Sequence, residues 1–172
     1  MLEKIKAPYL SVDHLKMGLI RSGRTALTPE DDDTLTEYLW PIVREMIKTA
    51  IENKQDLIVE GCYVPFDWRK DFDERYLPFL RFLCVAMTER YIEGHFDEII
   101  AHEAAIEERQ TGDCTPGSLK ADNKKYADGF CRCGEPVTLI DEAYELTMEK
   151  LADRLAALFE RNRKGTKQCW NN

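Results

Sequence analysis

Four short apolar runs alternate with longer amphipathic stretches along this chain of 172 residues, and the alternation restricts the fold more than any other feature. Between the runs, hydrophobic residues recur at the spacing of a helix face. The runs have the length of strands and cover Tyr9–Val12, Leu57–Cys62, Arg81–Met87 and Pro136–Ile140. Strands that alternate with helices form a parallel sheet with helices on both faces. The sequence therefore predicts one α/β domain over residues 1–172, a three-layer sandwich with a mainly parallel sheet.

Charge and hydropathy narrow the range of partners. The formal net charge of -8 argues against a nucleic acid as the main partner, because such binding depends on Lys and Arg side chains that neutralise phosphates. No apolar run has the length that spans a bilayer, and the first residues lack the apolar core of a signal peptide. We therefore expect a cytoplasmic protein that binds a small molecule and makes no membrane contact.

One segment, Thr111–Gly134, breaks the alternation. It is rich in Gly, Lys and Asp and poor in aliphatic residues, which predicts a long mobile loop that acts as a lid. The segment also holds Cys114, Cys131 and Cys133. Structural zinc sites prefer Cys-x2-Cys pairs, and this spacing does not occur here. We interpret the three cysteines as exposed thiols, with a zinc-bearing regulatory module as the alternative.

Polar residues gather where the predicted strands end. Ligands of open parallel sheets bind beyond the carboxyl ends of the strands, and the residues there are Asp13, Glu60, Arg90 and Asp141. Glu60 lies within an apolar run, where an unpaired carboxylate is costly. Asp13 is suited to accept a proton from a substrate hydroxyl, and Glu60 to hold Mg²⁺ through water. A role as helix cap is the expected one for Thr88 and Asp141, and it is the alternative for Asp13.

Several bases follow Asp13 and predict binding of a substrate phosphate or carboxylate. His14 comes directly after the strand and is expected to face the same cleft, with Arg21 or Lys16 on its rim. The predicted substrate-binding residues are His14, Lys16, Arg21 and Arg24. For each base alone, a solvated surface position is the alternative.

Four motifs together resemble the P-loop small-molecule kinases, the broad group that includes adenylate, shikimate and gluconate kinases. The likeness is to adenylate-kinase-like or 2-phosphoglycerate-kinase-like bacterial ATP-binding proteins, and it rests on the order and spacing of the motifs. They read PYLSVDHLKMG, LIVEG, CVAMTERY and PVTLIDEAYE. In the order of the chain, they resemble the start of the substrate site, the strand with a Walker B-type acid, the strand that leads to the lid, and the turn near the nucleotide base.

The resemblance implies phosphoryl transfer from ATP, with Mg²⁺, to a small hydroxyl- or phosphate-bearing acceptor. It implies that Asp13 meets the acceptor and that Glu60 is the Walker B-type acid. Arginines near a lid stabilise charge on a phosphoryl group in transfer, which predicts a catalytic role for Arg90, with surface salt bridges as the alternative. Asp141 would lie near the nucleotide base. The lid residues would be Arg109, Lys120 and Arg132.

The sequence contains no G-x-x-x-x-G-K-[ST] motif, which holds the ATP phosphates in this family. There the motif follows a central strand that precedes the equivalent of PYLSVD. We therefore expect a P-loop NTPase-like fold that lacks its first strand and Walker A loop, and weak or absent ATP binding. The explanations are a late start codon or truncated chain, which we favour, a natural loss, or a second copy of the chain that completes the sheet. The alternative function is that of a non-catalytic binding or interaction protein.

Overall fold

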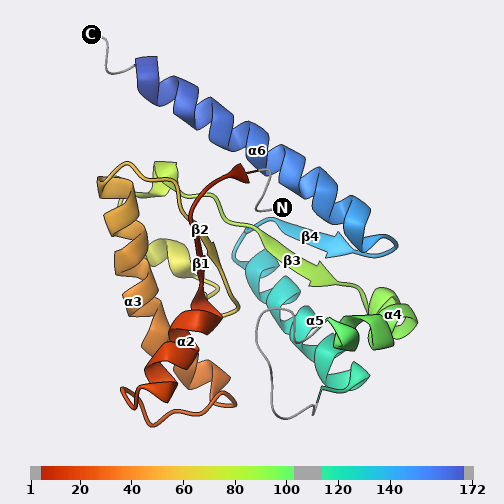
Figure 1. The fold of residues 1–172 in the computed structure, drawn as a ribbon. Coiled ribbons are helices and arrows are strands. Elements are labelled where there is room, and N and C mark those ends of the chain that lie inside the picture. Colours follow the sequence, from red (N-terminus) through yellow and green to blue (C-terminus); the bar gives the residue numbers. More distant parts are fainter. Residues whose placement is uncertain (1–4, 103–113, 169–172) are drawn as a thin grey trace.

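The computed structural model describes residues 5–102 and 114–168, with four strands, five helices and two short 3-10 turns (Figure 1). The strands are β1 (Tyr9–Ser11), β2 (Ile58–Glu60), β3 (Cys84–Met87) and β4 (Val137–Ile140). The helices are α2 (Val12–Arg21), α3 (Asp32–Glu52), α4 (Glu89–Ala101), α5 (Pro116–Arg132) and α6 (Tyr144–Gln168), and the turns are η1 (Trp68–Asp71) and η2 (Leu77–Phe79). The predicted α/β class is confirmed. Within these ranges no helix has both the length and the apolar character needed to cross a bilayer.

Each predicted strand is present in shortened form, but the strands form two sheets instead of one. β1 pairs in parallel with β2, and β3 pairs in parallel with β4. Within the described residues no strand pairing joins the two pairs, so the expected single sheet of a three-layer sandwich is wrong. Residues 61–83 run from β2 to β3 through both 3-10 turns, and their rings Phe66 and Phe82 pack against Phe130 of α5. Side-chain packing therefore links the two pairs where a single sheet would have a backbone ladder.

The first apolar run ends as a strand one residue earlier than predicted. Val12 is the first residue of α2 and is fully buried. Gly61, directly after β2, has a φ of +153°, and a Cβ at this position would lie 2.8 Å from the Cβ of Val12. Both the backbone conformation and the close contact therefore require glycine. This contact fixes the start of α2 against the end of β2.

The predicted loop Thr111–Gly134 is for the most part a helix, α5, which corrects the expectation of a lid-like loop. Residues 111–113 lie outside the described residues. Thr115 and Ser118 form a capping box at the start of α5, and Pro116 follows the cap. These signals favour a helix even where aliphatic residues are scarce. α5 packs along β3 and β4 (Figure 1).

An aromatic cluster, here called the aromatic bridge, joins the part of the chain around β1 and β2 to α5. It consists of Phe66, Trp68, Phe82 and Phe130. The ring of Phe130 on α5 lies 5.0 Å from Phe66 and 4.5 Å from Phe82 between centroids, and Trp68 lies 5.7 Å from Phe82. These rings belong to one hydrophobic core that also includes Val59 of β2 and Cys84 of β3. The two sheets thus share a core without sharing a strand ladder.

An ion pair strengthens the same junction. Glu135, just before β4, has a side chain that is 1% exposed, and both of its oxygens accept hydrogen bonds from Arg69 in η1. The Arg69 guanidinium also lies 4.6 Å from the ring centroid of Trp68. A buried carboxylate needs such a partner, because its desolvation is otherwise uncompensated.

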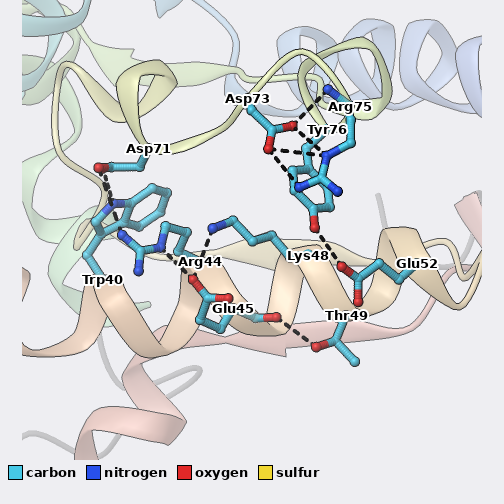
Figure 2. A network of polar contacts seen from close by, with 10 residues as sticks. All are labelled: Trp40, Arg44, Glu45, Lys48, Thr49, Glu52, Asp71, Asp73, Arg75 and Tyr76. Atoms are coloured by element: carbon cyan, nitrogen blue, oxygen red, sulfur yellow. Dashed lines mark hydrogen bonds and ion pairs between the residues drawn. The ribbon is translucent and has the colours of Figure 1, made fainter.

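Polar contacts tie η1 and the following residues to α3 (Figure 2). Trp40 Nε1 donates to Asp71 at 2.7 Å, and Tyr76 Oη donates to Glu52 at 2.6 Å. Between them, Lys48 Nζ lies 5.8 Å and 5.7 Å from the ring centroids of Phe72 and Tyr76. The segment that carries Phe66, Trp68 and Phe82 is therefore bonded to α3 and also packed against α5.

The aromatic bridge leaves no space at Gly129 of α5. A Cβ there would lie 2.5 Å from the Phe66 ring, whereas a Cβ at Gly117 of the same helix would make only an ordinary contact of 3.8 Å. We expect Gly129→Ala to lower the free energy of unfolding by about 1–3 kcal/mol through overpacking. Gly117→Ala, the matched control, should leave it unchanged or raise it by less than about 1 kcal/mol. Urea unfolding followed by tryptophan fluorescence measures both, and equal effects would contradict this packing.

Candidate functional site

The carboxyl ends of β1 and β2 bring the first two predicted acids to one edge. Ser11, the last residue of β1, is paired with Glu60, the last of β2, and Asp13 follows in the first turn of α2. Tyr9 Oη donates to Glu60 Oε2 at 2.7 Å. Burial and the hydrogen bond to Glu60 raise the pKa of Tyr9, and the negative charge of Asp13 adds to this effect. Asp13 and Glu60 therefore act on the same phenol.

Lys16 is the centre of a buried polar group beside Asp13. Its side chain is 3% exposed, and Nζ donates to Asp13 Oδ1 at 2.8 Å and to Tyr63 Oη at 3.2 Å. Tyr63 Oη in turn donates to Asp32 Oδ1 of α3 at 3.2 Å. The prediction that Lys16 lies on the rim of a cleft is wrong, because packing against Tyr63 takes it inside. The alternative that Asp13 caps a helix starting at His14 is also wrong, since α2 starts at Val12.

The neighbouring thiol is unsuited to nucleophilic chemistry. Burial raises the pKa of Cys62, and the negative charges of Asp13 and Asp32 raise it further. A thiol with a raised pKa carries little of the thiolate form that reacts. Cys62 is exposed at this edge, but it offers the site little reactive thiolate.

Helix α5 reaches this edge from the other half of the chain. Tyr126 lies near enough to Cys62 to influence the pKa of its thiol, and Lys125 Nζ lies 3.0 Å from Asp33 Oδ1 at the start of α3. Burial raises the pKa of Tyr126, with the nearby Cys62 as a further cause. The segment interpreted as a lid thus does contact the candidate site, as a packed helix.

A second polar group lies at the carboxyl ends of β3 and β4. Thr88 accepts a hydrogen bond from Tyr91 N, which confirms its predicted role as a helix cap, and donates to Asp141 Oδ1 at 2.7 Å. Arg90 forms an ion pair with Asp141 and lies 3.2 Å from Glu142. Hydrogen bonds from Arg90 and Thr88 lower the pKa of Asp141. Asp141 precedes Tyr144, the first residue of α6, by three positions and binds these two side chains, so its predicted role as a cap is wrong.

The remaining predicted substrate-binding residues are exposed, and two of them lie away from the Asp13 edge. His14 is exposed beside Asp13, and Arg21 and Arg24 are exposed at the far end of α2. Eight residues of helix separate Arg21 from Asp13 by about 12 Å, so the expectation that Arg21 lies on the rim is wrong.

The predicted lid residues have separate surroundings. Lys120 pairs with Glu93 of α4, and Arg132 is exposed at the end of α5. Arg109 lies outside the described residues.

Two hollows on the described surface are not lined by Asp13 or Glu60. One, of about 800 Å³, is formed by α3 and by the starts of β1 and β2, and Pro8, Ile42, Met46 and Leu57 contribute to it. The other lies along α4. Neither hollow is therefore the expected open cleft at Asp13. Lys16 and Tyr63 pack beside the Asp13 carboxylate instead.

The described residues contain no group of three or more His, Cys, Asp or Glu side chains placed to hold a metal ion. Comparison of the chain with protein-family models, with curated proteins and with solved structures found no match. Evidence on function therefore comes from the geometry of the site.

Sequence reasoning missed three side chains of the site, Tyr9, Tyr63 and Asp32. Tyr63 follows Glu60 by three residues, and a tyrosine so close to a strand-end acid was the available signal. Asp32 carried no such signal, because it reaches the site only through the packing of α3.

Removal of the buried ammonium should destabilise the fold. Lys16→Met leaves Asp13 and Tyr63 without their partner, and we expect the free energy of unfolding to fall by about 2–4 kcal/mol. A double-mutant cycle with Asp13→Asn should give a coupling of about 1–3 kcal/mol. Lys70→Met is the control, because Lys70 is 63% exposed in its pair with Asp67 and should change stability by less than about 1 kcal/mol. Urea unfolding tests this, and equal losses for both lysines would contradict the assignment.

The raised pKa of Tyr63 predicts that the folded state loses stability at alkaline pH. Burial raises its pKa far above the ordinary value of 10.0, and the negative charges of neighbouring Asp32 and Asp13 add to this. The contribution of Tyr63 to the free energy of unfolding is therefore present below the ordinary pKa of 10.0. It is lost as the pH rises past that value, because only the unfolded chain releases the phenol proton. A tyrosine that ionises only in the unfolded chain lowers the free energy of unfolding by about 1.4 kcal/mol for each pH unit above its ordinary pKa. Tyr63→Phe should remove this part of the dependence of stability on pH. Urea unfolding between about pH 9 and 11 measures it, and identical slopes in both proteins would refute this.

Proposed function

We propose that this chain belongs to a P-loop-type kinase domain that transfers a phosphoryl group from ATP to a small hydroxyl- or phosphate-bearing acceptor. In this proposal the carboxyl ends of β1 and β2 form the acceptor side. The observation that carries it is the division of the strands into two parallel pairs. In the kinases that the sequence resembles, the strand before the P-loop is central, and a sheet without it would leave such pairs.

The residues support separate roles at the two edges. Asp13 is held in one orientation by Lys16, as is required of a carboxylate that accepts a hydrogen bond or proton from an acceptor hydroxyl. Glu60 ends the neighbouring strand at the same edge. Arg90 is exposed at the other edge, where an arginine could exchange its carboxylate partners for a phosphate.

The chain fits Mg²⁺ and ATP unequally. Glu60 is an exposed carboxylate at a strand end, of the kind that binds Mg²⁺ through water together with phosphate groups. ATP phosphates need a glycine-rich loop and a lysine at a helix N-terminus, and this sequence contains no such motif. The proposal therefore assigns the chain the acceptor side of the reaction and no phosphate-binding loop.

Calorimetry and a transfer assay test the proposal together. The chain of 172 residues should bind magnesium-ATP weakly or not at all. A version extended at its N-terminus by a strand, a P-loop and a helix should bind it and transfer the γ-phosphate of labelled ATP to a small hydroxyl compound. Asp13→Asn in that version should lower kcat by at least about 100-fold. Asp97→Asn, on the exposed face of α4, is the matched control and should leave kcat unchanged.

Two outcomes would contradict the proposal. Micromolar binding of ATP by the unextended chain would place the nucleotide site among residues assigned here to the acceptor. An extended version that folds and binds ATP, yet phosphorylates no acceptor, would favour a non-catalytic binding protein.

A further inference from the structure

The second strand pair has an open outer edge along β4. Thr88 N donates to Ile140 O at 2.9 Å, so Ile140 directs its backbone groups toward the β3 side. Consecutive residues of a strand direct these groups to alternate sides, and the N–H and C=O groups of Val137 and Leu139 therefore point away from β3. Within residues 5–102 and 114–168 no third strand pairs with them.

A side chain closes the opposite edge of the same pair at Met87. The N–H of Met87 in β3 donates to Asn123 Oδ1 of α5 at 2.8 Å, and Asn123 Nδ2 donates to Leu119 O at 2.8 Å. The second bond fixes the orientation of the amide, so that its oxygen faces Met87. A helix side chain thus takes the place that the carbonyl of a neighbouring strand would have, whereas β4 has no such cover.

The sequence of β4 lacks the residues that protect strand edges. Natural edge strands avoid pairing with another chain through lysines, prolines, bulges or a covering segment. The residues of β4 read VTLI and include no charged residue and no proline. Parallel sheets normally have several strands, and a pair on its own is marginal in water. A further strand at β4 would remove both weaknesses.

Leu139 is a large apolar side chain that is left uncovered beside a buried face. Paired residues of a ladder share a face, so Leu139 lies on the same face as Ala86. Ala86 is 3% exposed, whereas Leu139 is 54% exposed. The core therefore shields the β3 side of this face and leaves its β4 side accessible to a partner.

We propose that β4 pairs antiparallel with β4 of a second copy of this chain, about a twofold axis at Thr138. In this register Val137 of one copy lies opposite Leu139 of the other, and each such pair exchanges both of its backbone hydrogen bonds. The edge is thus self-complementary, as a twofold dimer requires. The product is a four-stranded sheet, in which the side chains of Val137 and Leu139 from both copies lie together on one face.

The charges beyond the two ends of β4 are complementary in this register. Asp141 and Glu142 follow the strand beside Arg90, and the Glu142 side chain is 81% exposed. Arg69 lies at the other end of the strand, where it binds Glu135 and keeps 54% of its side chain exposed. Antiparallel pairing brings the acidic end of one copy to the Arg69 end of the other, and symmetry repeats this contact. Added salt should therefore weaken the dimer.

Sedimentation of the chain of 172 residues between about 1 and 500 μM tests for the dimer, in a range suited to a small interface. Leu139→Lys should raise the dissociation constant at least about tenfold, because an edge lysine opposes strand pairing. Phe79→Lys is the matched control. Phe79 is 63% exposed in η2, outside both strand pairs, and its replacement should leave the dissociation constant unchanged.

Amide hydrogen exchange tests the register. Where the dimer prevails, the amides of residues 137 and 139 should exchange at least about tenfold more slowly than in Leu139→Lys, because only the second copy binds them. The amides of Thr138 and Ile140 face β3 in each copy and should stay protected in both proteins. Their protection shows that the variant is folded. If the lysine variant loses it, Leu139→Thr takes its place and should weaken the dimer severalfold.

Three results would overturn the dimer at β4. The first is a chain that remains monomeric up to about 500 μM. The second is an equal effect of Leu139→Lys and Phe79→Lys on association. The third is a dimer in which the amides of residues 137 and 139 exchange as fast as in the monomer, since association would then use another surface.

Discussion

Ring packing between Phe130 and the side chains of Phe66 and Phe82 holds the two halves of this structure together. The strand pairs share no ladder, so the usual backbone continuity of an α/β sheet is missing between β2 and β3 in the described residues. Side-chain burial and the ion pair of Arg69 with Glu135 replace it. Hydrophobic contact lacks the directionality of a ladder, and the close fit at Gly129 supplies the missing specificity.

The same packing determines the composition of the candidate site. Because the aromatic bridge presses α5 against residues 61–83, Tyr126 comes to Cys62 and the edge at Asp13 is bordered by both halves. Lys16 shows the other effect of packing. A base that follows an acid by three residues on a helix suggests an ion pair on the surface. Tyr63 packs over Lys16 instead, so the ion pair of Lys16 with Asp13 is buried on the lysine side.

Local patterns predicted the positions of all four strands and the cap at Thr88, because spacing and capping chemistry depend on neighbouring residues. The sequence did not predict α5, since the stretch from Pro116 to Arg132 offers few aliphatic residues and its helix depends on a capping box and on Phe130. Two sheets in place of one, and the meeting of Asp32 with Tyr63, depend on contacts between residues distant in the chain. No periodicity reports such contacts.

The two strand pairs also have consequences for how the chain folds. A hydrogen bond between residues 51 apart, Tyr9 and Glu60, closes the first half, and one between residues 53 apart, Thr88 and Asp141, closes the second. Loop-closure entropy grows only with the logarithm of length, so the two closures cost nearly the same. Neither half therefore has an entropic advantage, and both consist of non-local pairings that form slowly. A difference in folding rate between the two halves would therefore have to come from their helices.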